Sequence, residues 1–422
     1  MRVALVSSVA GFALLVLSPL ALAAAGELDS TFDGDGRVTL DLGAADESAV
    51  DVAVQPDGKI VLLGTTGMSA VLARYTSTGA LDTTFDGDGF LVFTSLHPSA
   101  LVLQPDGKIV VAGTANGDFA NADFALARFN DDGTPDDSFD GDGLASADFV
   151  NHSNDIGRGV ALQPDGKIVV AGSSDANHEL GTVTVARFKD DGTLDDSFYN
   201  QGFRGWCCMS SYATAVAIQT NGKIVVAGST GVFSHTPRFF VARLKPDGTR
   251  DSSFSSDGQL QTRFGAEAQG LDVAVQADGR VVVAGSVGAF RHSDFALARY
   301  TSSGRLDTTF SGDGKRRMDF SGGADEALGL VIQPNGRIVA AGFAAPLHHP
   351  SDSDFGLARY RSNGSLDLSF SVNGKQRVRF GSNDQDSAFA VARQAGGKLV
   401  VAGQATLTPG LADLGLARLL GS

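Results

Sequence analysis

The sequence predicts an all-β fold, a seven-bladed β-propeller with four antiparallel strands in each blade. Its first sign is a hairpin, as in residues 101–113, where two apolar runs enclose a Pro-Asp-Gly turn. Glycine accepts the positive φ of tight turns, so Asp-Gly between apolar runs predicts a hairpin. The second sign is repetition, because units of 49 to 61 residues indicate a solenoid, a propeller or an array. The seven turn glycines are Gly58, Gly107, Gly166, Gly222, Gly279, Gly336 and Gly397.

Four strands fit each unit. The hairpin supplies the first two, a run such as 124–129 supplies the third, and a Leu-Asp-x-x-Phe segment with the residues after its next glycine supplies the fourth. The runs are rich in β-branched residues without a 3.6-residue apolar period, which excludes a helical solenoid. The connections within the two hairpins have constant length, and the other two vary. In an up-and-down sheet the variable loops share one end, where we expect binding.

The two ends of the repeat region support a closed ring. Residues 28–32 form a fourth strand without its own first three, and residues 416–419 end the chain on a third strand without a fourth. We therefore expect residues 28–42 to pair beside 412–419 and to complete the seventh blade. Residues 26–422 then form one propeller, with no room for a second domain.

Residues 1–25 have the composition of a secretory signal peptide. One charge, Arg2, precedes an apolar stretch that ends in small residues at 21–25. An uncleaved membrane anchor is the rival interpretation, but serines, a glycine and Pro19 interrupt the run. No other stretch approaches the roughly 20 apolar residues of a spanning helix. We expect a secreted or periplasmic protein with no membrane span after cleavage.

The charge of the chain excludes one class of partner. The formal net charge is −15, and loss of Arg2 leaves 32 basic and 48 acidic residues. A phosphate backbone would be repelled, so we expect no nucleic acid. The simple interpretation of the acidity is solubility, and we expect a monomer.

The repeats resemble the delta-60 repeat family of bacterial β-propellers. The pattern Gln-Pro-Asp-Gly-Lys-Ile-Val-Val-Ala-Gly stands at 163–172 and Asp-Phe-Ala-Leu-Ala-Arg-Tyr at 294–300. The seventh copy departs most, with Ala395-Gly396-Gly397 in its turn. The layout is also similar to NHL-type propellers, which implies that the first strand of each blade is innermost. The resemblance implies a fold and no assigned chemistry.

An arginine of the third strand and an aspartate eight residues later recur at fixed spacing. An aspartate in every blade points around the whole ring, whereas a catalytic site is one place. We therefore expect structural ion pairs across the hairpin of the third and fourth strands, with Arg418 and Asp29 paired across the closure. The pairs are Arg74 and Asp82, Arg128 and Asp136, Arg187 and Asp195, Arg243 and Asp251, Arg299 and Asp307, Arg359 and Asp367, and Arg418 and Asp29.

Acidic residues precede or begin the first strand in several blades. If that strand lines a central channel, they surround its mouth on the variable end and attract Ca²⁺, another divalent cation or a basic ligand. A solvated acidic rim is the simpler alternative. The candidates are Asp46, Glu47, Asp155, Glu267, Asp325, Glu326, Asp384 and Asp386.

Two further groups are weaker candidates. His348 and His349, near Asp352 and Asp354, are the best cluster for a transition metal, although loops are also simply where histidine is tolerated. Cys207 and Cys208 are adjacent and are the only cysteines. A vicinal disulfide and two free thiols both fit a secreted protein.

No catalytic motif stands out, so the sequence favours a non-catalytic binding or interaction scaffold that uses the variable-loop end. Its partner would be a protein, a glycan or a small cationic ligand. The alternative is a metal-dependent hydrolase or lyase with its site at the channel mouth, as in some NHL-like propellers. Both place the ligand at the same end of the molecule.

Overall fold

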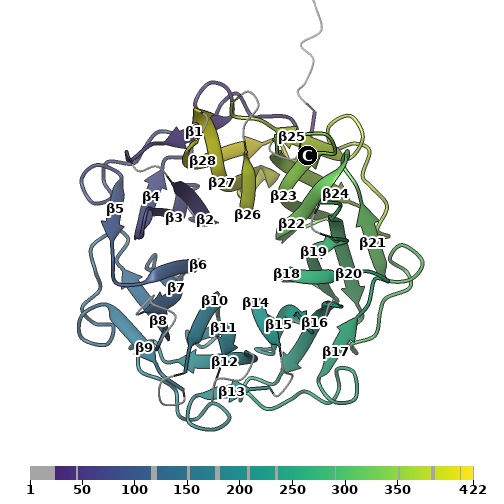
Figure 1. Ribbon diagram of the computed structural model, residues 1–422. Coiled ribbons are helices and arrows are strands. Elements are labelled where there is room, and N and C mark those ends of the chain that lie inside the picture. Colours follow the sequence, from purple (N-terminus) through teal and green to yellow (C-terminus); the bar gives the residue numbers. More distant parts are fainter. Residues whose placement is uncertain are drawn as a thin grey trace, which may run out of the picture.

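The computed structural model of the protein confirms the seven-bladed β-propeller. Its strands form seven four-stranded sheets in which neighbouring strands are antiparallel. Figure 1 shows these sheets as blades around one central opening. In the part of the chain that the structure describes, no helix is long and apolar enough to cross a membrane. The described residues are 24–43, 46–115, 121–149, 153–175, 181–206, 210–232, 236–289, 291–349, 352–381, 385–408 and 410–421.

The first three blades follow one another along the chain, each with its first strand at the channel (Figure 1). Blade 1 consists of β2 (Glu47–Val54), β3 (Ile60–Thr66), β4 (Ser69–Tyr75) and β5 (Phe90–Phe93). Blade 2 consists of β6 (His97–Leu103), β7 (Ile109–Ala115), β8 (Asp123–Phe129) and β9 (Leu144–Ala147). Blade 3 consists of β10 (Asp155–Leu162), β11 (Ile168–Ser174), β12 (Thr182–Phe188) and β13 (Phe203–Gly205).

The remaining blades repeat this order, and only the last takes its outer strand from the other end of the chain. Blade 4 consists of β14 (Ser211–Ile218), β15 (Ile224–Thr230), β16 (Arg238–Leu244) and β17 (Gln259–Thr262). Blade 5 consists of β18 (Ala268–Val275), β19 (Val281–Val287), β20 (Asp294–Tyr300) and β21 (Lys315–Met318). Blade 6 consists of β22 (Gly322–Ile332), β23 (Ile338–Pro346), β24 (Asp354–Tyr360) and β25 (Lys375–Val378). Blade 7 consists of β26 (Ser387–Arg393), β27 (Leu399–Thr408), β28 (Leu411–Leu419) and β1 (Arg37–Leu40), with a short 3₁₀ turn at Ala395–Gly397.

The N-terminal strand closes the ring, as the sequence predicted. Strand β1 pairs antiparallel with β28, so that Arg37 lies opposite Ala417 and Leu40 opposite Leu414. The fourth strands are shorter than expected, because the Leu-Asp-x-x-Phe segment forms a turn. The four-residue outer strand begins only after the glycine that follows this segment in six of the blades, and β13 has three residues. The phenylalanine of the turn is fully buried in every blade, so its role is packing.

The apolar core lies between neighbouring blades and forms seven clusters, one at each junction. At the junction of blades 1 and 2, Leu63 and Phe85 pack with Val111 and Ala127. Backbone hydrogen bonds hold each sheet together, whereas side-chain burial holds the sheets to one another. Full burial of one such side chain stabilises the fold by about 1.5–3 kcal/mol.

A β-bulge interrupts the innermost strand of every blade at the same place. In β10, Gly157 pairs with Gly172 and Gly159 pairs with Ala171, so Arg158 is the extra residue. The repeated Ala-Gly of the second strand permits this bulge, because a Cβ on Gly172 would overlap the carbonyl oxygen of Ile156. The bulge turns side chains of the innermost strand toward the channel.

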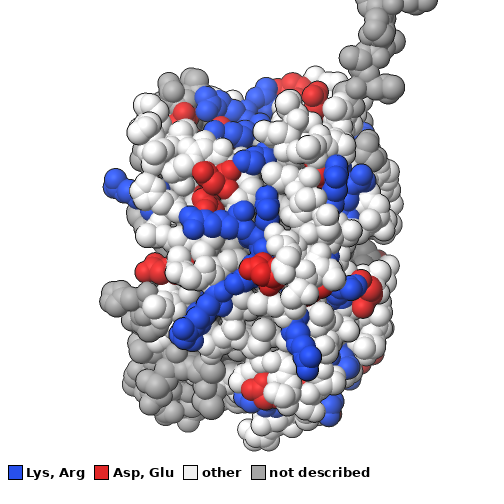
Figure 2. Space-filling model, turned by 90° about the vertical axis from the view of Figure 1, so that its right-hand side faces the viewer, with Lys and Arg blue, Asp and Glu red and all other residues white. Residues whose placement is uncertain are grey.

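The charge of the protein is distributed unevenly around the ring. Residues 46–206, which form blades 1 to 3, contain 9 basic and 25 acidic residues, whereas residues 210–381, which form blades 4 to 6, contain 19 and 15. Figure 2 shows lysine and arginine side chains spread over one outer side of the molecule, the right-hand side of Figure 1, where β17 and β21 lie. The acidity that the composition reports therefore belongs mainly to blades 1 to 3.

Candidate functional site in the central channel

The two ends of the propeller differ in how they hold carboxylates. At the end with the constant turns, each arginine of the repeat contacts the aspartate eight residues later, and in blade 7 Arg418 contacts Asp29. The distances from arginine Nε to the carboxylate are 2.6–2.9 Å in all seven blades. These arginines and aspartates are all buried. The repeated pairs therefore form a built-in part of every blade.

Each pair belongs to a larger network. The Arg74 guanidinium lies 5.0 Å from the centre of the Phe85 ring, and it donates to the backbone carbonyl of Asp131 in the next blade. The lysine after the Pro-Asp-Gly turn adds a second cation, with Lys59 Nζ 3.0 Å from Asp82. The sequence analysis did not foresee this third partner, although a basic residue follows all seven turn glycines. The network links each blade to its successor, so it is structural.

These cations and hydrogen bonds keep the turn-end aspartates ionised. Burial opposes ionisation of Asp29, but hydrogen bonds from Lys398 and Thr31 and the charge of Arg418 outweigh it and lower the pKa of Asp29 to about 2. The same balance lowers the pKa of Asp82. A carboxylate with this environment is suited to holding a fold and is a poor general acid.

At the variable end, four of the predicted acidic residues lie inside the blade junctions. They are buried at the start of the innermost strand and accept hydrogen bonds from backbone N–H groups. Asp386 accepts from Phe380 at 2.8 Å and from Thr406 at 2.8 Å, for example. None of the four lines the central cavity described below. The four residues are Glu47, Asp155, Asp325 and Asp386.

The other predicted residues are dispersed. Asp46 and Glu267 are exposed, and Glu326 is half-buried with its pKa raised by burial. His348 and His349 are exposed. Their expected partners Asp352 and Asp354 form ion pairs with Arg379 at 3.4 and 2.8 Å. Asp384, Cys207, Cys208 and residues 1–23 lie outside the described residues.

Three junctions bring together groups of carboxylates that a cation could bridge. Each group combines an acid in the first three residues of a third strand, the residue after the outer strand, and the buried acid of the next blade. Within the described residues the three groups contain no histidine. At the junction of blades 6 and 7, Arg379 takes the place of the second acid and binds Asp354. The groups are Asp41, Glu47 and Asp413; Asp123, Asp148 and Asp155; and Asp294, Asp319 and Asp325.

The seven bulges face one another around the central channel. A cavity of about 180 Å³ lies there and is lined by residues from all seven blades. The bulge residues are mostly apolar or hydroxylated, and one is charged; they are Val50, Ser99, Arg158, Thr214, Leu271, Leu328 and Phe389. The next residue along each strand is small in five blades and an aspartate in two; these residues are Asp51, Ala100, Gly159, Ala215, Asp272, Gly329 and Ala390.

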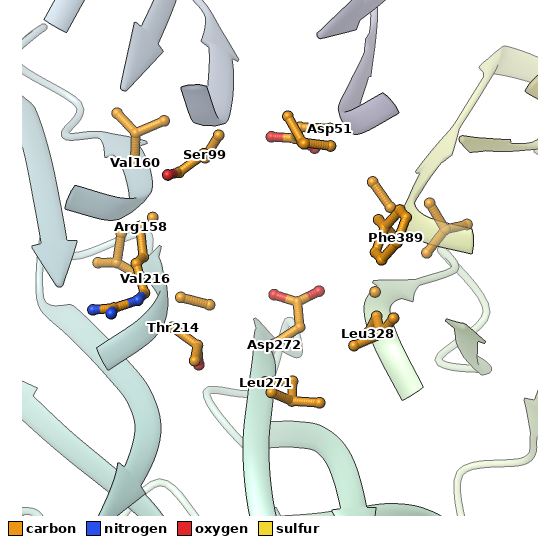
Figure 3. Close-up of a pocket in the computed structure, with 17 residues that line it drawn as sticks. Asp51, Ser99, Arg158, Val160, Thr214, Val216, Leu271, Asp272, Leu328 and Phe389 are labelled. Atoms are coloured by element: carbon orange, nitrogen blue, oxygen red, sulfur yellow. The ribbon is translucent and has the colours of Figure 1, made fainter. Parts of the chain in front are cut away.

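Asp51 and Asp272 are therefore the two carboxylates of this cavity. Figure 3 shows their side chains in the central space, with the Asp272 carboxylate directed toward Asp51. Asp51 accepts hydrogen bonds from the backbone N–H groups of Val52 and Leu101, at 2.7 and 2.8 Å. Asp272 accepts in the same way from Val273 and Leu330, at 2.7 and 2.6 Å. Each carboxylate thus spans two blades and has no cation beside it among the described residues.

Burial and the missing counter-ion raise the pKa of both carboxyl groups. Burial raises the pKa of Asp51 to about 6, against the opposing effect of its two backbone hydrogen bonds. Burial and the negative charge of Asp51 raise the pKa of Asp272 to about 7. Carboxyl groups with raised pKa values in a cavity are a common property of functional sites. Neither residue was predicted from the sequence, although each stands where the other five blades have alanine or glycine.

These features define the protein as a β-propeller with two carboxylates in its channel. The family model described as "Domain of unknown function (DUF5122) beta-propeller" matches residues 55–85, 104–139, 163–198, 219–254, 276–310 and 333–370. The matches cover half of the chain, and the protein belongs to this family of β-propellers. A comparison with curated protein sequences gives no match.

Solved structures share the fold at low sequence identity. Virginiamycin B lyase from Staphylococcus aureus, in a catalytically inactive form with quinupristin, superposes with a TM-score of 0.53 at 11% identity, over 90% of this chain and 98% of that one. A protein of unknown function from Dyadobacter fermentans has a TM-score of 0.48 at 13% identity, over 92% and 98%. YCF48 from Cyanidioschyzon merolae has a TM-score of 0.47 at 12% identity, over 90% and 98%. The likeness to the lyase concerns the fold alone.

Proposed function

We propose that the protein is a non-catalytic binding module that takes a cationic group of its ligand into the channel, between Asp51 and Asp272. One observation carries this proposal: these two carboxylates share a cavity and have no cationic partner among the described residues. A ligand ammonium group would supply the missing charge and would also keep both carboxyl groups ionised.

The fold does not require these aspartates. Ala100, Ala215 and Ala390 occupy the same position in other blades, and Gly159 and Gly329 occupy it in the remaining two. Those five blades pack around the same axis without a carboxylate there. A half-buried acid whose pKa is raised costs stability when it is ionised. Its presence in two blades is therefore better explained by binding than by architecture.

Titration calorimetry with butylammonium chloride at pH 8 tests the proposal. We expect the wild-type protein to bind the probe and the double variant Asp51→Asn/Asp272→Asn to bind it at least about tenfold more weakly, because the cation loses two charge-assisted contacts. The matched control is Asp137→Asn/Asp196→Asn, which removes the same charge from exposed positions. Equal binding by wild type and the channel variant would overturn the proposal.

The alternative is a metal-dependent hydrolase or lyase, and the carboxylate groups at three junctions favour a divalent cation such as Ca²⁺ in that case. The described lining of the central cavity contains no histidine, so Asp51 and Asp272 would be the charged ligands of a metal there. Metal analysis of the purified protein separates the two functions. One tightly held divalent ion at the channel supports the enzyme, whereas weak uptake at junctions supports the binding module.

The setting of this function is also part of the proposal. We infer a secreted or periplasmic monomer whose repeats are of the delta-60 type, because residues 1–25 have signal-peptide composition and the repeat motifs match that pattern. Mass spectrometry of the protein exported by a bacterial host gives its N-terminus. An intact residue 1 on the exported protein would contradict the expected cleavage.

A further inference from the structure

One arginine near the channel has no acidic partner in the part of the chain that the structure describes. Arg158 is the bulge residue of β10 and the charged one among the seven bulge residues. Its Nη1 donates to Ser173 Oγ at 2.7 Å, and its guanidinium carbon lies 5.0 Å from the centre of the Tyr212 ring. No carboxylate of the described residues lies within ion-pair distance of Arg158, whereas the seven repeated arginines each contact an aspartate.

Arg158 also connects two cavities. It lines the central cavity with Asp51 and Asp272, and it lines a second cavity of about 270 Å³ between the inner strands of blades 3 and 4. Figure 3 shows its guanidinium turned away from the channel axis and away from Asp272. The second cavity is lined by Asn154, Ile156, Ser173, Asp175, Ser211 and Tyr212, among others. A ligand could therefore contact Arg158 from either side.

The acid in the second cavity is engaged elsewhere. Asp175 accepts hydrogen bonds from the backbone N–H and the side-chain amide of Asn154, the latter at 2.8 Å. It lies beyond ion-pair distance of Arg158. Burial lowers the pKa of Arg158, so the half-buried cation is destabilised where it stands. An anion in the cavity would relieve this, and the planar guanidinium matches a carboxylate with two parallel hydrogen bonds.

We propose that Arg158 is an anion subsite that binds the carboxylate of a small bipolar ligand, an amino carboxylate, whose ammonium group reaches Asp51 and Asp272. The ammonium half of this inference rests on the function proposed above, and the carboxylate half does not. Opposite charges in two cavities that share Arg158 as a lining residue select a ligand with matching opposite charges, and they disfavour simple cations and simple anions.

The experiment uses fragments and whole ligands on the full mature chain at pH 8, followed by nuclear magnetic resonance titration. The probes are acetate, butylammonium, and the series glycine, β-alanine, 4-aminobutanoate and 6-aminohexanoate. We expect acetate to bind weakly and one amino carboxylate to bind at least about tenfold more tightly than either fragment, because the second contact becomes intramolecular.

Substitutions test the carboxylate contact and the ammonium contact separately. Arg158→Gln should abolish acetate binding without weakening butylammonium binding, and Arg158→Lys should restore part of the acetate binding. The matched control is Arg204→Gln, since Arg204 is also stacked on aromatic rings, Tyr199 and Trp206, and has no acidic partner among the described residues. Circular dichroism of each variant verifies folding.

The outcomes separate the inference from the proposed function. Acetate binding that survives Arg158→Gln, or no acetate binding by wild type, overturns the anion subsite. If the wild type binds acetate but does not bind butylammonium, the channel function is overturned and the anion subsite stands. If no amino carboxylate binds more tightly than its fragments, the bipolar ligand is excluded. An Arg204→Gln effect equal to that of Arg158→Gln would show a general loss of packing and would also overturn the inference.

Discussion

The aspartates at the turn end of the blades and the two aspartates in the channel differ in what surrounds them. At the turn end, Asp82 lies against Arg74 and Lys59, and these cations help to lower its pKa. In the channel, Asp272 lies against backbone N–H groups, and burial raises its pKa to about 7. The first arrangement is repeated seven times and the second occurs in two blades. The carboxylates that occur in every blade stabilise the fold, whereas the two that occur in single blades are available to a ligand.

The largest effect should come from breaking one turn-end network. Arg299→Ala should lower the free energy of unfolding by about 3–5 kcal/mol, because Asp307 would stay buried with Arg280 as its remaining cation. Urea denaturation followed by circular dichroism measures this. Arg305→Ala, at an exposed position of the same blade, is the control and should change stability by less than about 0.5 kcal/mol. If Arg299→Ala and Arg305→Ala lower the free energy of unfolding equally, the buried ion pair does not stabilise the fold as proposed.

The bulge that creates the channel ring can be tested next. A Cβ on Gly285 would overlap the carbonyl oxygen of Gln269 in β18. Gly285→Ala should therefore cost about 1–3 kcal/mol of stability, and it should weaken butylammonium binding because Asp272 follows that bulge. Gly205→Ala, where the new Cβ meets only the Thr184 hydroxyl, should be close to neutral. If Gly285→Ala keeps normal stability but loses butylammonium binding, the bulge geometry determines binding and the predicted packing cost is wrong.

The opposite pKa shifts give opposite pH dependence. The folded pKa of Asp272, about 7, exceeds an unfolded value near 3.9. Its contribution to stability is therefore greatest at low pH and is lost as pH rises through 7, so Asp272 alone should cost about 1 kcal/mol between pH 6 and pH 8. Burial also raises the pKa of Asp325 to about 7, so Asp272→Asn should reduce the loss of stability over this range by that amount and leave the part due to Asp325. Below pH 4 the sign reverses, because Asp29, with a folded pKa of about 2, loses its stabilising charge as the pH falls.

The smallest effect belongs to the outer cation of the turn-end network. Lys59 is about one-third exposed, and its side chain is 3.0 Å from Asp82. Lys59→Ala should cost about 0.5 kcal/mol, because solvent screens the pair and Arg74 remains. The exposed Lys189 is the control. A cost equal to that of Arg299→Ala would show that both cations are needed equally, contrary to their burial.

The sequence was sufficient for the fold because every element occurs in several copies. Seven hairpin turns and a split seventh blade determine the ring, and constant Arg-to-Asp spacing pointed to the ion pairs. The channel site was not predicted, because the direction of Asp51 and Asp272 depends on a bulge. That bulge arises when the innermost strand pairs with a glycine of the next strand, which only the three-dimensional register shows.

The predicted acidic rim is a second example of what the sequence could not show. Asp155 and Asp325 stand at the start of innermost strands, as expected, but they accept hydrogen bonds from the chain entering the blade. Position in the sequence located them at the correct end of the molecule. It could not show that neighbouring blades cover them, because that contact joins residues of different repeats.

The closure of blade 7 determines when the ring can form during synthesis of the chain. Strand β1 is synthesised first, and its partner β28 is among the last segments made. Until residues 411–419 are available, the ring is an open arc whose two end blades expose the apolar surfaces that later meet around Leu62 and Leu416. The ring can therefore close only after the last strand has been made, and an unfinished chain exposes apolar surface at both of its end blades.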